Sequence, residues 1–418
     1  MLDLRLIRSD PDAVRAALAR RGDVEPGAIA AVLALDAERR EATEAAETLR
    51  ARQKQDARAV ASAQQAGEDA GPAIAAARDL AEQVKARGAL AAEAGERLEA
   101  ALAALPNLPD PTAAPADEVL RVVGEAWVPD FPALDHLALA GSRVDMERGA
   151  RLSGSRFAYL RGDLVFLELA LVQWTLRTLA GHGFEPVLPP VLVREQALYG
   201  TGFLPDTEQQ IYHLPADELY LAGTSEVALA SMHAGEVLDA ADLPLRYAGF
   251  SPCFRREAGT AGRDTRGVFR VHQFDKVEMF SFVHPDESAA EHERLLAIEE
   301  ELLTTLGIPY RVVNIAVDDL GASAAKKYDC EAWLPGQGEY RELTSTSNTT
   351  DFQARRLNVR FRAQGGKPAV LHTLNGTAVA VGRTLIAMLE NGQQSDGSVD
   401  LPEVLVAFGA PERLMAMR

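Results

Sequence analysis

The sequence predicts an α+β protein: an N-terminal antiparallel two-helix coiled-coil arm, followed by a domain built on a mainly antiparallel sheet flanked by helices. Two observations support this fold class. Residues 27–105 are dominated by Ala, Glu, Arg, Gln and Leu, with one break containing glycine and proline at 66–72. The later part of the chain instead shows short segments of alternating apolar and polar residues, the pattern of half-buried strands. These segments lie near 248–256, 268–282, 309–315, 340–345 and 369–375.

Residues 27–105 are bounded and interrupted by proline and glycine in the way typical of a helical hairpin. Pro26 and Gly27 precede it, and Pro106 and Pro109 follow it. Two helices of about 35 to 40 residues joined at the break would each be roughly 55 Å long. The apolar stripe along them is thin, which favours a two-helix seam over burial in a core. The stripe consists of Ile29, Val32, Leu33, Leu49 and Val60 on the first helix and of Leu80, Val84, Leu98, Leu102 and Leu105 on the second.

Charges along the hairpin are sorted by sign. Residues 36–47 hold five acidic residues and two arginines, whereas residues 50–58 hold four basic residues and one acidic residue. Antiparallel pairing would place the basic segment beside Arg78, Lys85 and Arg87. One interpretation is the solvated face of any long helix, and the other is a surface that contacts a polyanion. The bases concerned are Arg50, Arg52, Lys54 and Arg58.

Composition excludes several classes of protein. The net charge of −18 over 418 residues argues against a generally nucleic-acid-binding surface, although a local patch can override the sum. Cys253 and Cys330 lack the spacing of a disulfide framework or a zinc site, which fits a reducing cytoplasm. The first residues lack a signal-peptide core, and no uncharged apolar run reaches about 18 residues, so we expect no membrane span. Neither GxGxxG nor GxxxxGK[ST] occurs, which disfavours Rossmann and P-loop nucleotide sites.

One segment concentrates positive charge: FRREAGTAGRDTRGVFRVHQFDKVEMF, residues 254–280. We expect a hairpin in which a glycine-rich loop connects two strands. Strand alternation would put Arg255 and Glu257 on one face, where the arginine can hold a phosphate and the carboxylate an amino group. The cations in the segment are Arg255, Arg256, Arg263, Arg266, Arg270 and Lys276.

The return strand carries an acidic residue on an apolar face. Glu278 shares that face with Phe274, Phe280 and Phe282. A carboxylate buried there needs a partner, because leaving it unpaired costs several kcal/mol, roughly. A ligand amino group and a salt bridge to a neighbouring arginine both remain open as that partner.

Five segments in order along the chain carry a resemblance to a known family. FRREAG with HQFDKVEM resembles motif 2 of the class II aminoacyl-tRNA synthetases, in the form used by bacterial seryl-tRNA synthetases. The other four are GFEPVLPP at 183–190 (motif 1), TSEV at 224–227 (the serine-site loop), RELTSTSN at 341–348 (the ATP and magnesium segment) and NGTAVAVGRTLIAMLEN at 375–391 (motif 3). The hairpin matches that family's tRNA-binding arm in place and length. The connector after PNLP lacks the SVPxG-like turn of the family, which leaves the domain junction open.

The resemblance implies two domains and one activity. Residues 1–110 would be the tRNA-binding domain that contains the hairpin, and residues 111–418 the class II catalytic domain. The implied activity is that of an ATP-dependent serine–tRNA ligase, which forms seryl-adenylate and transfers serine to tRNA(Ser), and to tRNA(Sec) where that tRNA is present. ATP and Mg²⁺ are the implied cofactors. A cytoplasmic homodimer joined through motif 1, with no membrane partner, is the implied form.

The resemblance also assigns the nucleotide-binding residues. Arg255 would contact the α-phosphate and the serine carboxylate, Glu257 the adenine amino group, and Arg383 the γ-phosphate; these three form the catalytic set. Glu342 and Ser345 would hold Mg²⁺ through oxygen donors. A straight strand would point these two to opposite faces, so we expect a bulge or a strand end between them. The full ATP-binding set is Arg255, Arg256, Glu257, Val271, Glu342, Leu343, Thr344, Ser345 and Arg383.

Serine binding is assigned to hydroxyls and carboxylates. Which acceptor serves the serine hydroxyl and which the amino group stays open at this point. Thr224 and Ser225 would in addition suit the start of the helix that follows them. The set is Thr224, Ser225, Glu226, Glu278 and Thr377, and the arm bases Arg50, Arg52, Lys54 and Arg58 are the implied tRNA contacts.

Two other classes compete with this interpretation. An amino-acid:carrier-protein ligase on the same catalytic fold would lack the long arm, which the segment 27–105 supplies. A non-catalytic relative acting as a binding module would be expected to lose Arg255, Glu257 or Arg383, and the sequence retains all three.

Overall fold

The computed structural model describes residues 1–22, 24–67, 69–205, 210–258 and 267–417. Contacts between residues divide the chain into two compact units, one of residues Leu2–Pro106 and one of Asn107–Arg418 with Met1. Each unit is described by itself below.

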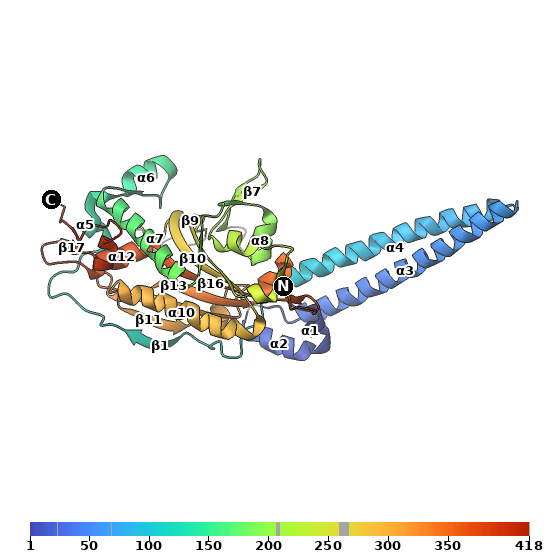
Figure 1. Cartoon of the computed structure of the whole chain (residues 1–418), viewed down its shortest axis with the longest axis horizontal. Coiled ribbons are helices and arrows are strands. Elements are labelled where there is room, and N and C mark those ends of the chain that lie inside the picture. The colour runs from blue at the N-terminus through green and yellow to red at the C-terminus, as the bar shows by residue number, and fades with distance from the viewer. Residues whose placement is uncertain (23, 68, 206–209, 259–266, 418) are drawn as a thin grey trace. The chain divides into compact units, whose positions relative to one another are not determined.

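The first unit is helical and contains the predicted hairpin (Figure 1). The long helices α3 and α4 pack along each other in antiparallel fashion, and Gly67, which caps the C-terminus of α3, has a left-handed φ of 72°. None of the ten apolar stripe residues is exposed, which confirms the thin seam. The helices are α1 (Leu4–Ser9), α2 (Pro11–Ala19), α3 (Ala28–Ala66) and α4 (Gly71–Ala103).

One acidic residue of α3 is buried, although the sequence pattern grouped it with the exposed acids. The Asp36 side chain is 1% exposed. Arg8 of α1 donates to both of its carboxylate oxygens at 2.6 Å, and Arg39 and Arg40 donate at 3.2 and 3.1 Å. The hydrogen bonds from Arg8 hold the pKa of Asp36 below its ordinary value, against the effect of burial. A buried carboxylate with three cationic partners anchors α3 on the first helix.

The second unit is built on an eight-stranded sheet in the order β1-β11-β12-β13-β16-β10-β9-β4. Every neighbouring pair is antiparallel except β4 and β9, which confirms the mainly antiparallel sheet. The alternation pattern had not predicted β12 or β1. The strands are β1 (Glu118–Val123), β4 (Glu185–Val187), β9 (Leu245–Phe254), β10 (Gln273–Val283), β11 (Tyr310–Asn314), β12 (Lys326–Leu334), β13 (Glu339–Thr350) and β16 (His372–Ala380).

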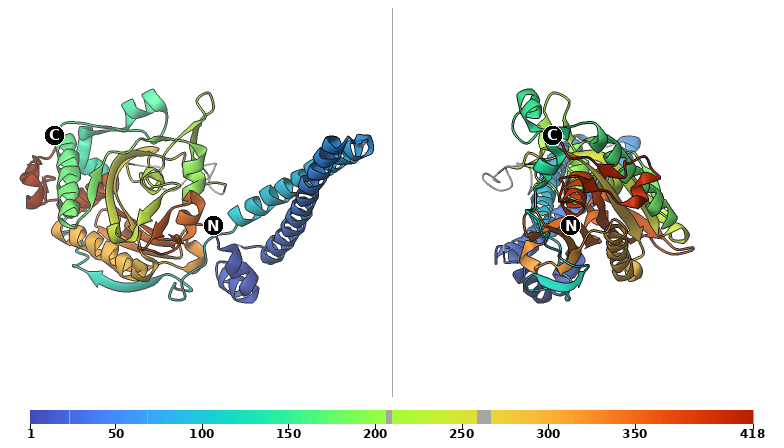
Figure 2. Two further views of the ribbon diagram at one scale, coloured as in Figure 1. Left: turned by 45° about the vertical axis from the view of Figure 1, so that its right-hand side comes forward. Right: turned by 90° about the vertical axis from the view of Figure 1, so that its left-hand side faces the viewer.

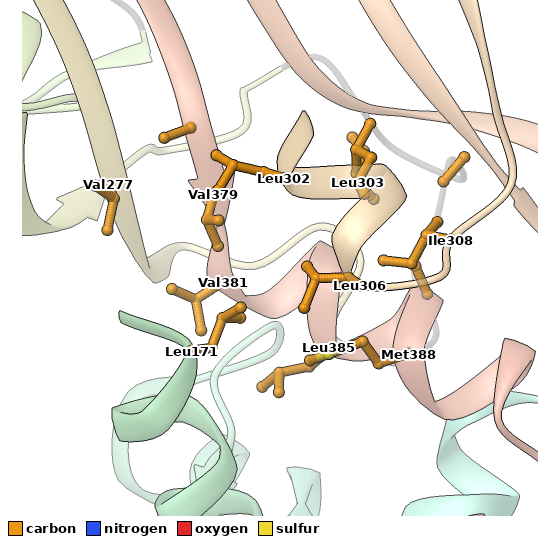
Figure 3. Close-up of a cluster of buried hydrophobic side chains, with 14 of the residues drawn as sticks. Leu171, Val277, Leu302, Leu303, Leu306, Ile308, Val379, Val381, Leu385 and Met388 are labelled. Atoms are coloured by element: carbon orange, nitrogen blue, oxygen red, sulfur yellow. The ribbon is translucent and has the colours of Figure 1, made fainter. Parts of the chain in front are cut away.

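Helices cover both faces of this sheet (Figure 1 and Figure 2). On one face α7 (Asp163–Gly181), α10 (Ser288–Thr305) and α12 (Val381–Asn391) bury the main core together with strand residues such as Val277 and Val379 (Figure 3). On the other face α9 (Glu226–Ser231) and α11 (Phe352–Leu357) pack against Phe280 and Phe282 of β10. The alternation of β10 thus separates a fully covered face from one that is only partly covered.

Smaller elements surround the sheet. The remaining helices and strands are α5 (His136–Ala140), β2 (Val144–Asp145), α6 (Met146–Ser153), β3 (Tyr159–Leu160), β5 (Leu192–Val193), α8 (Glu195–Thr201), β6 (Tyr212–Leu214), β7 (Leu219–Leu221), β8 (Val237–Asp239), β14 (Arg360–Arg362), β15 (Ala369–Val370), β17 (Val399–Asp400), α13 (Glu403–Val406) and β18 (Arg413–Leu414).

Helix α7 is long and apolar enough to cross a membrane by length and composition, the one such helix among the described residues. The core helix of a soluble protein passes the same test, and Leu164, Leu167 and Leu171 of α7 lie in the main core. The helix begins at Asp163, which lies in its first turn while Gly162 takes the cap position, and it ends at Gly181.

Candidate active site

A cavity of about 420 Å³ opens on the partly covered face of the sheet in the second unit. Its wall draws on β10, β12, β13, β16 and the start of α12. The structure therefore gathers most of the sequence-predicted site in one place. The predicted residues that line it are Thr224, Glu226, Arg255, Glu257, Val271, Glu278, Glu342, Leu343, Thr344, Ser345, Thr377 and Arg383.

Two predicted residues lie outside the lining of this cavity. The buried Ser225 hydroxyl donates to the carbonyl of Gly249 at 3.3 Å. The backbone N–H of Arg256 donates to the carbonyl of Gln210 at 2.9 Å. Neither residue has a described contact that would direct its side chain to a ligand in the cavity.

The β9–β10 hairpin positions the first arginine of the cluster. β9 ends at Phe254, which pairs with Gln273 of β10, so Arg255 directly follows the strand. The Arg255 guanidinium lies 5.3 Å from the centroid of the Phe274 ring, and its Nε donates to the carbonyl of Gly223 at 3.3 Å. An aromatic face and a carbonyl thus restrict this guanidinium where it lines the cavity.

Strand alternation does not explain the position of Glu257. Because β9 has already ended, Glu257 adopts a left-handed φ of 49° instead of an extended conformation, so that part of the prediction is wrong. Its carboxylate accepts a hydrogen bond from Arg270 Nη1 at 2.6 Å while lining the cavity. The predicted cations Arg263 and Arg266 lie outside the described residues.

Carboxylates dominate the part of the cavity formed by β10 and α9. Glu278 forms a salt bridge with Lys276, and Thr377 Oγ1 donates to Glu278 Oε2 at 3.4 Å across the β10–β16 pair. Glu226 Oε1 accepts hydrogen bonds from Gln353 at 2.7 Å and from Asn375 at 2.9 Å. This end of the cavity therefore offers acceptors suited to a small ligand with an amino group and a hydroxyl.

Burial changes the protonation of Glu226. Its removal from water, together with the negative charge of Glu278, raises the pKa of Glu226 to about 7. The hydrogen bond from Gln353 and the cations Lys276 and Arg255 oppose the shift. Glu226 therefore gains or loses its charge close to neutral pH.

The loop before α9 serves both structure and site. Thr224 Oγ1 accepts a hydrogen bond from the backbone N–H of Glu226 at 3.2 Å, at the start of the helix. Ser225 occupies the N-cap position without a side-chain cap bond. Thr224 thus pairs with a backbone N–H at the start of the helix without occupying the cap position, and it lines the cavity as well.

A bulge brings Glu342 and Ser345 to the same cavity. The register of β12 and β13 shifts so that Cys330 faces Thr344 and Glu331 faces Glu342, leaving Leu343 as the extra residue. The bulge expected between the two oxygen donors is confirmed.

Arg383 fixes the first of these donors. Its Nη1 donates to the Glu342 carbonyl at 3.0 Å and lies 3.3 Å from Glu342 Oε1. Burial raises the pKa of Glu342, but Arg383 and Lys327 outweigh that effect and the net pKa shift is downward. An ionised carboxylate beside a serine hydroxyl is a donor set that suits Mg²⁺ next to phosphates.

Clusters of metal-ligating side chains are absent from the described part of the chain. There, no group of three or more His, Cys, Asp or Glu side chains converges in a way that could hold a metal ion. Cys253 and Cys330 are both free and buried.

Sequence reasoning missed several residues of the cavity wall. Lys276 was predicted only as one cation of the positively charged segment. It stands two residues before Glu278 on the same face of β10, so strand alternation could have placed it in the site. The centroid of the Phe269 ring lies 4.1 Å from the Arg341 guanidinium and 4.8 Å from that of Arg383. No local sequence pattern indicates that Phe269 belongs to the cavity wall. Asn375 and Lys327 also line the cavity.

The four predicted tRNA-contacting bases lie on α3 in the first unit. Arg50, Arg52, Lys54 and Arg58 are all exposed. Arg52 pairs with Asp56 one turn away at 3.7 Å, a distance at which an exposed ion pair contributes little.

The sheet, its helices and the arginine- and carboxylate-lined cavity define a class II aminoacyl-tRNA synthetase core. Residues 212–392 match the family model described as "tRNA synthetase class II core domain (G, H, P, S and T)", and residues 1–109 match "Seryl-tRNA synthetase N-terminal domain". With relatives of that name matching nearly its whole length, the chain belongs to the seryl-tRNA synthetase family, as its motifs predicted.

Relatives and solved structures agree with this placement. The chain is 54% identical to the serine–tRNA ligase of Acidothermus cellulolyticus over 97% of both chains, and 50% identical to that of Nocardia farcinica over 98% of both. Among solved structures, it is similar to seryl-tRNA synthetase from Pyrococcus horikoshii complexed with ATP (TM-score 0.93, 40% identity, 100% of both chains). It is also similar to cytoplasmic serine-tRNA ligase from Naegleria fowleri in complex with AMP (TM-score 0.88, 30% identity, 100% of this chain and 99% of that one).

Proposed function

We infer that the chain activates L-serine with ATP to form seryl-adenylate and then transfers serine to tRNA(Ser), and to tRNA(Sec) where that tRNA is present. The observation that carries this inference is the division of charge within one cavity. Arg255 and Arg383 line the wall beside Glu342, whereas Glu226 and Glu278 line the wall beside Thr377. A triphosphate and a small amino acid fit these two regions by charge.

The first step joins two anions, since the serine carboxylate attacks the α-phosphate of ATP and the bond to pyrophosphate breaks. We assign charge neutralisation at this step to Arg255 and assign the γ-phosphate to Arg383. Glu257 takes the adenine amino group and Val271, which is buried, an apolar contact with the adenosine. No protein nucleophile is required, so the chemistry rests on positioning and charge.

The serine amino group is assigned to the carboxylates of Glu226 and Glu278, with Thr224 and Thr377 as hydroxyl partners. Their hydrogen bonds hold these side chains in place before a ligand binds. A site that hydrogen-bonds the serine hydroxyl would reject alanine by roughly 10⁴-fold, because its buried polar groups would be left unpaired. In the second step the terminal ribose of tRNA attacks the seryl carbonyl, and AMP leaves.

Glu342 and Ser345 are the residues we assign to Mg²⁺. The downward pKa shift of Glu342 keeps its carboxylate charged, and the bulge at Leu343 lets both oxygen donors reach one cavity. When bound, the ion would neutralise phosphate charge.

A homodimer is the oligomeric form we propose. Side chains of α7 that do not enter the core remain largely exposed, with Phe166 at 59% and Leu169 at 58%, and Leu188 after β4 is 78% exposed. Large apolar residues grouped on one helix and the neighbouring motif 1 segment suit a surface covered by a second copy. We assign residues 1–110 to tRNA binding, residues 111–418 to catalysis, and the enzyme to the cytoplasm.

Pyrophosphate exchange into ATP, measured with each of the twenty amino acids, tests the proposal. We expect exchange with serine and, on addition of total tRNA, serine attachment that depends on ATP. Attachment of an amino acid to a carrier protein but not to tRNA would instead favour the carrier-ligase alternative. Absence of exchange with every amino acid would favour the non-catalytic alternative.

A further inference from the structure

Among the described residues, three cations of the cavity wall have no part in the chemistry assigned so far, and two of them, Arg270 and Lys276, pair with Glu257 and Glu278. The third is Lys327. Lys327 extends from β12 and lines the cavity. Its Nζ lies 3.1 Å from both carboxylate oxygens of Asp329, and the two side chains are 21% and 7% exposed. Of the two oxygens only Oδ2 accepts a hydrogen bond from it, and Oδ1 has no hydrogen-bond partner among the described residues. An ammonium carries three donors, so this pair leaves donors for another anion.

The strand register places this pair beside the metal-binding segment. Lys327 faces Ser347 and Asp329 faces Ser345 across the β12–β13 pair. Residues directly opposite on an antiparallel pair share a face and have Cβ atoms about 5 Å apart. Lys327 and Asp329 therefore border Ser345, on the face of the sheet where the cavity opens.

The order of strands indicates which part of the reactants this cation meets. The serine-binding residues Glu278 and Thr377 lie on β10 and β16, the metal-binding segment lies on β13, and Lys327 lies on β12. With neighbouring strands about 4.8 Å apart, Lys327 lies across the metal-binding segment from the serine-binding residues. In the first step the attacking carboxylate and the leaving pyrophosphate must occupy opposite sides of the α-phosphate.

We propose that Lys327 is a further substrate-binding residue of the reaction, whose ammonium contacts the β- and γ-phosphates of ATP and then the leaving pyrophosphate. Asp329 acts as a positioning residue that holds the ammonium against the cavity wall. The inference rests on the proposed function, because that function assigns serine to one end of the cavity and the phosphates of ATP to the other.

Substitution of Lys327 by methionine removes the charge and keeps the length of the side chain. In ATP–pyrophosphate exchange with serine, K327M raises the KM for pyrophosphate and for ATP by about ten-fold to a hundred-fold, the effect of one lost charge-assisted hydrogen bond. The KM for serine and the rate of transfer from preformed seryl-adenylate to tRNA stay unchanged. K327R restores most of the pyrophosphate affinity, and D329N shifts the same two constants as K327M but less.

The neighbouring lysine provides a matched control. Lys326 lies outside the cavity lining; its Nζ donates to Thr112 Oγ1 at 2.9 Å and lies 4.8 Å from the centroid of the Tyr328 ring. K326M therefore leaves the exchange constants unchanged. Thermal unfolding of every variant shows whether it is folded. If K327M does not fold, K327R still tests whether a positive charge at this position is sufficient for pyrophosphate binding.

Several results would overturn the proposal. These are unchanged KM values for ATP and pyrophosphate in K327M, an equal rise in the KM for serine, an equal effect of K326M, or slower transfer to tRNA with normal exchange. The last would assign Lys327 to a phosphate of the tRNA. Lack of exchange in the unmodified enzyme would refute the proposed function itself, which separates the two failures.

Discussion

The ammonium of Lys276 contacts the carboxylate of Glu278, two residues further along β10, and both side chains are nearly buried, at 7% and 2% exposed. Because successive side chains of a strand alternate between faces, residues two apart point into the same cavity. The structural partner of Glu278 is thus a lysine of the cavity wall and not a neighbouring arginine. Salt bridge and ligand binding are compatible, since a carboxylate can accept several hydrogen bonds.

Replacement of Glu278 by glutamine should weaken serine binding selectively. The variant keeps the shape of the side chain but removes the negative charge that we assign to the serine amino group. We expect the KM for serine to rise by about ten-fold to a hundred-fold, as for loss of a charge-assisted hydrogen bond. The KM for ATP should change by less than about three-fold. ATP–pyrophosphate exchange measures both constants, and an equal loss for both ligands would indicate a purely structural salt bridge.

Serine binding should weaken as the pH falls through neutrality. The pKa of Glu226 is raised to about 7 by burial and by Glu278, so its negative charge is present above that pH and is lost below it. The amino group of free serine lies beside the serine carboxylate and is therefore less acidic than a peptide α-amino group, whose pKa is about 8, so it stays positively charged from roughly pH 6 to 8. We therefore expect the KM for serine to be higher at pH 6 than at pH 8, measured by exchange at saturating ATP.

The isosteric variant E226Q provides the control for this pH dependence. It should bind serine poorly at every pH in the range and show a flat profile between pH 6 and 8. A wild-type profile that is also flat, or a variant that retains the slope, would assign the titration to another group.

The sequence allowed prediction of those features of the fold that have a local period. The thin apolar stripe of α3 and α4 follows from apolar residues three to four positions apart. The alternation of β9, β10 and β13 follows from residues two positions apart. β12 was missed because both of its faces are covered. Asp329 lies on one face and Cys330 and Ala332 on the other, and all three are buried, so the strand shows no alternation of apolar and polar residues.

Contacts between distant residues could not be predicted in the same way. The burial of Asp36 depends on Arg8, which lies 28 positions earlier. Glu257 reaches the cavity through a left-handed turn that no strand pattern contains. The bulge at Leu343 was nevertheless predictable, because the chemistry required Glu342 and Ser345 to face one ligand while a regular strand would separate them.

Reversal of charge at Arg255 should abolish adenylate formation. A carboxylate at this position would lie against the reacting phosphate and the serine carboxylate, adding repulsion where neutralisation is needed. For R255E we expect exchange activity to fall by at least about 10²-fold, the scale of losing one preorganised electrostatic contact. R255K, which keeps a charge but not the planar fork, should lose less activity. Exchange at the wild-type rate in R255E would refute the assignment to the phosphate.

A charged residue on the exposed face of α7 should disrupt the proposed dimer. Phe166 is 59% exposed and lies on the surface that a second copy would cover. Sedimentation at micromolar concentration should give a species of twice 45.0 kDa for the wild type and a larger monomer fraction for F166E. V128E, at an exposed valine outside α7, should sediment as the wild type does. Only a 45.0 kDa species for the wild type would contradict the dimer.

The basic segment of the arm should be needed for tRNA charging but not for adenylate formation. Arg50, Arg52, Lys54 and Arg58 are exposed on α3, in a helical hairpin that contains no residue of the cavity. Recognition of a structured RNA by shape and phosphate contacts would use such charges without reading bases. With all four replaced by glutamine, the KM for tRNA should rise by at least about ten-fold, and its dependence on salt should become shallower, since each lost phosphate contact removes about 0.7 to 0.9 from the slope.

Exchange activity without tRNA distinguishes this role from a general loss of structure. The variant with all four bases replaced by glutamine should exchange pyrophosphate at a normal rate, because we assign adenylate formation only to residues of the second unit. Replacement of the exposed acids Glu41, Glu44 and Glu47 of the same helix by glutamine is the matched control, and it should leave the KM for tRNA equal or lower. Unchanged charging in the basic-segment variant would mean that these bases are only a solvated face of the helix. A parallel fall of exchange and charging would mean instead that the arm supports the catalytic unit.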